Sequence, residues 1–166
     1  RITRGVRVQN PENTIECINK IYNHNDIFFL GRLIDYALCM EGSLKLKEIS
    51  YIHSEAYAGG ELKHGTIALM EKGIHTIVIC TDKELMGKVI SNIKEIKARN
   101  AEVLLITDLD PAEEIYDDII RIPEVNKLLS PIVAIVPLQL IAYHVAVLKG
   151  LDVDKPRNLA KSVTVE

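Results

Sequence analysis

The segment from Ile74 to Thr107, IHTIVICTDKELMGKVISNIKEIKARNAEVLLIT, decides the fold class. It opens with a β-branched apolar run, which predicts a buried strand over Ile74–Cys80. A more polar stretch follows and predicts a helix over Asp82–Arg99, with Asp82 as its N-cap. A second apolar run predicts a strand over Val103–Thr107. A strand, a helix and a strand in this order indicate a parallel βαβ unit.

The same alternation continues on both sides of this segment. Toward the amino terminus we expect a helix over Pro11–Asn23, a strand over Asp26–Gly31 and a long helix over Tyr36–His53. We then expect a break over His53–Gly60, with a very short strand near Glu55–Ala58, and a mostly helical stretch over Glu61–Lys72. Toward the carboxyl terminus we expect a strand over Ile119–Ile122, a helix over Lys127–Lys149 stopped by Gly150, and an irregular tail. The pattern predicts an α/β fold with a doubly wound, mostly parallel sheet of four or five strands flanked by helices.

The bulk composition is that of one ordinary globular domain. The chain has 166 residues, of which 48% are hydrophobic and 26% charged, and its net charge is −3. We expect a leading segment and first helix over residues 1–25, a core over residues 26–150 and a tail over residues 151–166. A slightly acidic chain gives no reason to expect a nucleic-acid partner.

The cysteines and the apolar runs bear on the compartment. Cys17, Cys39 and Cys80 are odd in number and widely spaced, which favours free thiols in the reducing cytosol over a disulfide or zinc framework. The longest apolar run, Leu128–Leu148, is interrupted by proline and polar residues, so we expect no membrane span. We expect no signal peptide, and the start at Arg1 without a methionine suggests an excised fragment. It shows no GxGxxG, P-loop or HExxH pattern, so we expect no cofactor and no metal.

Three segments carry groups suited to catalysis, and each has a plainer interpretation. Lys45 and Glu48 are three residues apart, so they share a helix face and can form a base with a cationic partner; the alternative is a solvent-exposed ion pair. His64 lies between glycines in Gly59–Gly65 and can act as an acid or base near neutral pH; the alternative is a surface loop. Lys161 in the tail can attack a carbonyl if it is held and partly desolvated; the alternative is an ordinary surface lysine.

The remaining histidines give weaker signals. His53, His75 and His144 have no metal-ligand spacing. His75 is expected at the edge of a strand, and His144, on an apolar helix, is expected to be a core histidine.

Four stretches together resemble one family. They are EGSLKLKEISYIHSEAY at 41–57, GELKHG at 60–65, VPLQLIAYH at 136–144 and PRNLAKSVTVE at 156–166. They are similar to the second sugar-isomerase (SIS) domain of the glutamine–fructose-6-phosphate aminotransferases, which has a flavodoxin-like fold. The GELKHG stretch indicates only an SIS domain, whereas the closing PRNLAKSVTVE is far more specific. The resemblance runs from about Asp26 to the last residue.

The resemblance implies a role for each candidate residue. Glu48 matches the general base that moves a proton between carbons 1 and 2 of the sugar, and Lys45 matches the lysine that assists it. His64 matches the histidine of ring opening, which a neighbouring subunit of a homodimer delivers. Lys161 matches the lysine proposed to form a Schiff base with the open-chain ketose, and Ala160 lies at the sugar site.

The resemblance further implies a cytoplasmic enzyme that makes glucosamine 6-phosphate from fructose 6-phosphate and glutamine. The amidotransferase domain and the first SIS domain of such an enzyme, with its phosphate-binding loops, are missing here. Two positions depart from the family pattern: Leu33 replaces a glycine after the first strand, and Thr66 replaces a proline after GELKHG. The alternative is a non-catalytic sugar-phosphate-binding SIS domain of a regulator, which would need no intact set of catalytic groups.

Overall fold

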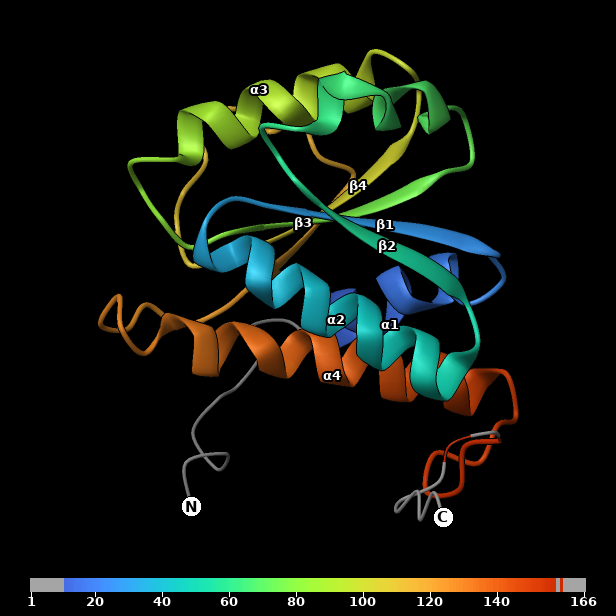
Figure 1. Ribbon diagram of the computed structural model, residues 1–166. Coiled ribbons are helices and arrows are strands. Elements are labelled where there is room, and N and C mark those ends of the chain that lie inside the picture. The colour runs from blue at the N-terminus through green and yellow to red at the C-terminus, as the bar shows by residue number, and fades with distance from the viewer. Residues whose placement is uncertain (1–10, 158, 160–166) are drawn as a thin grey trace, which may run out of the picture.

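A five-stranded parallel sheet forms the middle layer of the computed structural model, which describes residues 11–157 and residue 159 (Figure 1). The strand order is β2-β1-β3-β4-β5, and every neighbouring pair is parallel. The strands are β1 (Asp26–Gly31), β2 (His53–Ala58), β3 (His75–Cys80), β4 (Glu102–Thr107) and β5 (Asp118–Arg121). Every residue of β3 is buried, as expected of a central strand covered on both faces.

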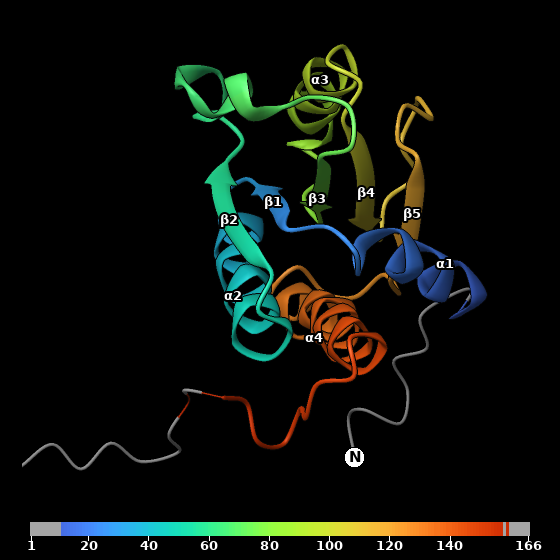
Figure 2. The same cartoon turned by 90° about the vertical axis from the view of Figure 1, so that its right-hand side faces the viewer.

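Helices cover both faces of this sheet (Figures 1 and 2). They are α1 (Pro11–Ile21), α2 (Ile34–Ser50), α3 (Met86–Lys97) and α4 (Ser130–Leu148), with two short 3-10 helices, η2 (Leu62–His64) and η3 (Thr66–Leu69). The helices α1, α2 and α4 lie on one face, while α3, η2 and η3 lie on the other. Each face has its own core of buried apolar residues. The prediction of a doubly wound α/β fold is therefore confirmed.

The boundary between α2 and β2 corrects the sequence prediction. The helix ends at Ser50 rather than His53 because Tyr51 adopts left-handed backbone angles, φ 59° and ψ 18°. This early stop frees residues for a six-residue strand in place of the very short one expected. That strand pairs along the whole of β1, from Asp26 opposite His53 to Gly31 opposite Ala58.

Two predicted helices are also shorter than expected. The stretch Glu61–Lys72 contains only η2 and η3, separated by Gly65 at φ 137°, an angle that no helix tolerates. The helix α3 begins at Met86, so Asp82 is not its N-cap. The Asp82 carboxylate instead accepts the backbone N–H of Glu84 at 3.0 Å within the preceding turn.

The helix α4 corrects the prediction about apolar length. It has 19 residues without a charged side chain, so by length and composition alone it qualifies as a membrane-spanning helix. Its prolines lie at the second position and at Pro137, and they do not end the helix. One face of α4 packs on α2 and belongs to the core under the sheet, with Ala134, Leu138 and Ile141 almost fully buried. In this fold one face of α4 belongs to the core, while Ile132, Tyr143 and Val147 on the other face are about half exposed.

The three cysteines are free and buried. Burial raises the pKa of Cys17 and of Cys80 to about 12, so both thiols stay protonated. The expectation of free thiols is confirmed.

Candidate functional site

The candidate base and its partner lie together on the last turns of α2. Lys45 Nζ donates to Glu48 Oε2 at 2.8 Å, and Glu41 of the same helix lies 3.6 Å from the same nitrogen. The hydrogen bond to Glu48 is the main reason that the pKa of Lys45 is raised, so the lysine stays a cation. The two side chains are 34% and 26% exposed, which makes the pair neither a freely solvated ion pair nor a buried one. A carboxylate held this way can accept a proton from a substrate beside a fixed positive charge.

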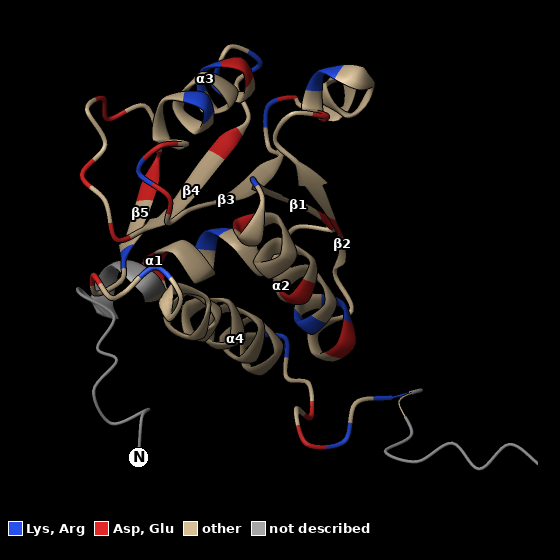
Figure 3. Ribbon diagram, turned by 60° about the vertical axis from the view of Figure 1, so that its left-hand side comes forward, with Lys and Arg blue, Asp and Glu red and all other residues tan. Residues whose placement is uncertain are grey.

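The pair occupies an unusual end of the fold. The helix α2 starts after the carboxyl end of β1 and runs back to the start of β2, so Glu48 lies near the amino ends of the strands. Ligands of doubly wound sheets generally bind at the opposite edge. Figure 3 shows acidic and basic residues gathered at this end of α2, beside an α4 that is free of charge along its length.

His64 is not part of this cluster within one chain. It lies in η2, which follows the carboxyl end of β2, and its side chain is exposed. Figure 2 shows this segment on the α3 side of the sheet, whereas α2 lies on the α4 side. The structure therefore separates His64 from Lys45 and Glu48 by the length of β2 and the thickness of the sheet.

The tail approaches the end of α2. The backbone N–H of Arg157 donates to the hydroxyl of Tyr51 at 2.7 Å, and the Arg157 guanidinium lies 4.2 Å from the centre of the Tyr51 ring. Ala160 and Lys161, the tail residues expected at the sugar site, lie outside the described residues. Leu159 is 48% exposed, so its side chain does not anchor the tail by burial.

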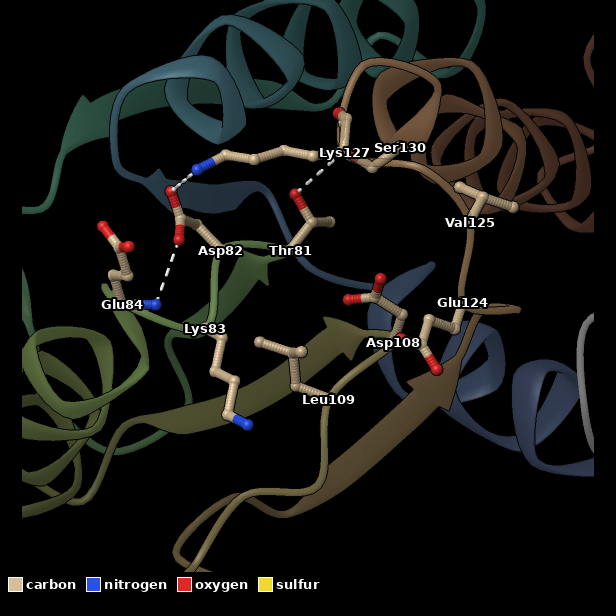
Figure 4. Close-up of a pocket in the computed structure, with 10 residues that line it drawn as sticks. All are labelled: Thr81, Asp82, Lys83, Glu84, Asp108, Leu109, Glu124, Val125, Lys127 and Ser130. Atoms are coloured by element: carbon tan, nitrogen blue, oxygen red, sulfur yellow. Dashed lines mark hydrogen bonds and ion pairs between the residues drawn. The ribbon is translucent and has the colours of Figure 1, made fainter.

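A pocket of about 580 Å³ lies at the edge of the sheet where ligands of this fold class usually bind (Figure 4). Asp82 projects into it and pairs with Lys127 at 2.8 Å, and the Thr81 hydroxyl points toward Ser130. Burial raises the pKa of Asp108, and one of its oxygens has no partner among the described residues. The lining residues are Thr81, Asp82, Lys83, Glu84, Asp108, Leu109, Glu124, Val125, Lys127 and Ser130.

Four acidic residues against two lysines make this pocket a poor host for a sugar phosphate. No group of three or more His, Cys, Asp or Glu side chains within residues 11–157 could hold a metal ion. The polar residues that follow β3 and β4 in the sequence were the available signal for this pocket.

Two histidine contacts were not foreseen from the sequence. His75, at the start of β3 as expected, is buried, and its Nε2 lies 2.8 Å from Nε2 of His24. His53 Nδ1 lies 2.8 Å from a carboxylate oxygen of Asp26 on the neighbouring strand. His144 is only half-buried, with its ring edge against Tyr143, so the prediction of a core histidine is wrong.

The two departures from the family pattern have different consequences. Leu33 takes φ 52° and ψ −117°, a conformation suited to glycine, and its side chain is 75% exposed. The turn after β1 is thus formed with a leucine in a conformation that glycine usually adopts. Thr66 is the first residue of η3, where it does not disturb the chain.

The chain is similar in sequence to known proteins over most of its length. The chain is 59% identical over 147 residues to a protein of Clostridium acetobutylicum named glutamine–fructose-6-phosphate aminotransferase [isomerizing], with 87% of this chain and 24% of the relative covered. It is 56% identical to a protein of the same name from Clostridium perfringens, covering 96% of this chain and 27% of that relative. The chain thus spans about a quarter of the length of these curated relatives.

A solved structure is similar to this chain in both fold and sequence. It is described as the C-terminal domain of glucosamine-fructose-6-phosphate aminotransferase from Francisella tularensis, and it matches with a TM-score of 0.81 and 37% identity over 87% of this chain and 41% of that one. The family model for the SIS domain matches residues 20–149, which contain all five strands and the Lys45–Glu48 pair. The chain belongs to the SIS domain family.

Proposed function

We propose that this chain is the isomerase domain of an enzyme that converts fructose 6-phosphate and glutamine to glucosamine 6-phosphate and glutamate. The observation that carries the proposal is the Lys45–Glu48 pair at 2.8 Å, half-buried at the end of α2, in a chain 59% identical to a protein of that name. A domain that only bound sugar phosphates would need no fixed base beside a cation.

In the proposed reaction, ammonia condenses with the open-chain ketose at carbon 2 and water leaves. Glu48 then removes a proton from carbon 1 and returns it to carbon 2, while the carbon 1 hydroxyl loses its proton and the imine nitrogen gains one. The result is an aldehyde at carbon 1 and an amine at carbon 2. Lys45 stands beside the carboxylate and can stabilise negative charge that develops on the substrate oxygen.

The other candidate groups complete this proposal. His64 assists ring opening from the partner subunit of a homodimer, because its own chain holds it on the far side of the sheet from Glu48. Lys161 binds the ketose carbonyl, and Ala160 lies beside the sugar. We propose residues 26–150 as the domain core, with residues 1–25 leading into it and 151–166 as a catalytic tail.

The relatives are about four times longer than this chain, which leaves room for further parts. We propose that a glutamine amidotransferase domain supplies the ammonia and that a first SIS domain binds the sugar phosphate. The buried free thiols fit a reducing cytoplasm.

The change Glu48→Gln tests the proposal in an enzyme of the relatives' length that carries this chain. An amide cannot accept the proton, so glucosamine 6-phosphate formation should fall by about 10²-fold or more while glutamine hydrolysis continues. Glu41→Gln is the matched control, because Glu41 lies near the same lysine on the same helix. It should leave synthesis nearly unchanged. Normal synthesis by the Glu48 variant would rule out Glu48 as the base.

A further inference from the structure

Tyr51 joins two parts of the chain that are 106 residues apart. Its hydroxyl accepts the backbone N–H of Arg157, and its ring face lies under the Arg157 guanidinium. The two contacts use different parts of both residues, a main-chain donor in one case and a cationic side chain in the other. Together they fix the position and the direction of the chain at Arg157.

The backbone at Tyr51 is unfavourable for a tyrosine. A residue that ends a helix in the left-handed conformation is usually glycine, because a side chain is strained there. Tyr51 nevertheless has φ 59°. Strain of this kind can be offset by contacts that glycine could not make, and the contacts with Arg157 are of that kind.

The chain that leads to Arg157 is itself ordered by hydrogen bonds. Gly150 turns it back at φ 68°, and the N–H of Leu151 bonds to the carbonyl of Ala146 at 3.0 Å. The Asp152 carboxylate then accepts the N–H groups of Asp154 and Lys155 at 3.0 and 3.1 Å. The segment after α4 is thus guided to the end of α2.

We propose that Tyr51 is a positioning residue for the isomerase site. It lies three residues, or about one helical turn, beyond Glu48, so the clamp fixes Arg157 at the end of α2 that carries the candidate base. This inference rests on the proposed function, since the role in synthesis requires that Glu48 and Lys161 act on the sugar.

Hydrogen exchange in the 166-residue chain tests the clamp itself. Tyr51→Phe keeps the ring but removes the acceptor, so the Arg157 amide should exchange about 5-fold faster, the loss expected for one hydrogen bond. Tyr143→Phe is the control, because it removes a phenol hydroxyl from the exposed face of α4 and should leave exchange at Arg157 unchanged. Equal exchange in the wild type and in Tyr51→Phe would overturn the proposal.

Synthesis in the longer enzyme tests the positioning role. Tyr51→Phe should lower kcat for glucosamine 6-phosphate by about 5-fold and Tyr51→Ala by about 10-fold or more, with glutamine hydrolysis unchanged. Tyr51→Gly separates position from stability. It relieves the backbone strain, so it should be more stable than Tyr51→Ala yet equally slow in synthesis.

The outcomes distinguish this inference from the function on which it rests. Synthesis that follows the stability of the variants, or that is normal in Tyr51→Gly, would overturn the positioning role and leave the function of Glu48 intact. Full synthesis by Glu48→Gln would overturn the assignment of Glu48 as the base and with it the positioning role, even if Tyr51→Phe speeds exchange of the Arg157 amide.

Discussion

At the scale of single residues, two side chains stand where the backbone favours glycine. Tyr51 has contacts that explain its presence, whereas Leu33 does not. The Leu33 side chain is 75% exposed, so burial contributes little to offset the strain of φ 52° and ψ −117°. The backbone strain at Leu33 therefore lowers the stability of the fold, and no gain in packing compensates for it.

Leu33→Gly should accordingly raise the free energy of unfolding by about 1 kcal/mol, measured by urea denaturation. Asn100→Gly is the matched control. Asn100 has a similar φ of 62°, but asparagine tolerates this conformation, so the change there should be much smaller. A loss of stability in Leu33→Gly would show that the leucine makes contacts that matter more than the strain.

His75 should make stability depend on pH. Burial is the main reason that its pKa is lowered from 6.5, with a further decrease from the nearby His24 and an opposing effect of Glu102. His75 therefore binds a proton more readily in the unfolded chain than in the folded one. The free energy of unfolding falls as the pH drops below 6.5. Above that pH the contribution is complete. The other charged groups that act on His75 are Asp117 and Asp118, both of which favour its charged form.

Replacing His75 by glutamine should remove part of this dependence. Urea unfolding at about pH 7.5 and about pH 5.5 would show a smaller difference for His75→Gln than for the wild type. His53→Gln is the control, because it removes an imidazole from a side chain that is 63% exposed. An unchanged difference in His75→Gln would assign the acid sensitivity to other groups.

At the scale of elements, the contact between α2 and α4 depends on a glycine. A Cβ on Gly42 would lie 3.0 Å from a methyl group of Leu138 and 3.1 Å from the ring of Phe29. Both neighbours are 2% exposed or less and sit in the core, where they have little room to move. The two helices can approach this closely only because position 42 has no side chain.

Gly42→Ala should therefore lower the free energy of unfolding by about 1 kcal/mol, even though alanine favours a helix. Gly87→Ala in the first turn of α3 is the control. Nothing lies within 4 Å of the added Cβ there, so stability should be unchanged or slightly higher. Thermal unfolding of both variants separates crowding from helix propensity, and equal effects would argue against crowding.

Elements defined by local composition were the ones that could be predicted. The apolar runs of β1, β3 and β4 form strands within a residue or so of their predicted limits, because a strand covered on both faces needs only a short apolar run. The end of α2 could not be predicted, since it depends on a tyrosine in a glycine conformation. The η2–η3 segment has helix-forming residues, but Gly65 interrupts it.

In the candidate site, too, the contacts within one helix could be predicted and the contacts between distant parts of the chain could not. The spacing of Lys45 and Glu48 predicts their shared helix face, and the structure pairs them. The contact of Tyr51 with Arg157 joins distant parts of the chain, and no local sequence pattern predicts it. The pairing of His24 with His75 is likewise a product of the fold, because it brings the end of α1 against the start of β3.

At the scale of the whole molecule, the candidate groups lie on opposite sides of the sheet. Glu48 is on the α4 side near the amino edge, and His64 is on the α3 side beyond the carboxyl end of β2. One chain cannot bring them together without unfolding β2. A site that uses both groups must combine residues of two chains.

Mixed dimers of an enzyme of the relatives' length test this arrangement. Glu48→Gln and His64→Asn should each be inactive in synthesis alone. After the two variants are unfolded together and refolded in equal amounts, half the dimers are mixed and each has one intact site, so about a quarter of the wild-type activity should return. No recovery, with dimers formed, would place His64 outside the site or make both groups act within one chain.

The apolar helix α4 has a consequence for how the protein is made. It is the last of the described helices to leave the ribosome, yet it covers the face of α2 and closes the core beneath the sheet. Until Leu148 emerges, the nascent chain carries an α2 whose face toward α4 has nothing to pack against. Such exposed apolar surface is what holding chaperones bind and what drives aggregation of unfinished chains. Translation that stalls before α4 should therefore release an aggregation-prone fragment rather than a smaller folded domain.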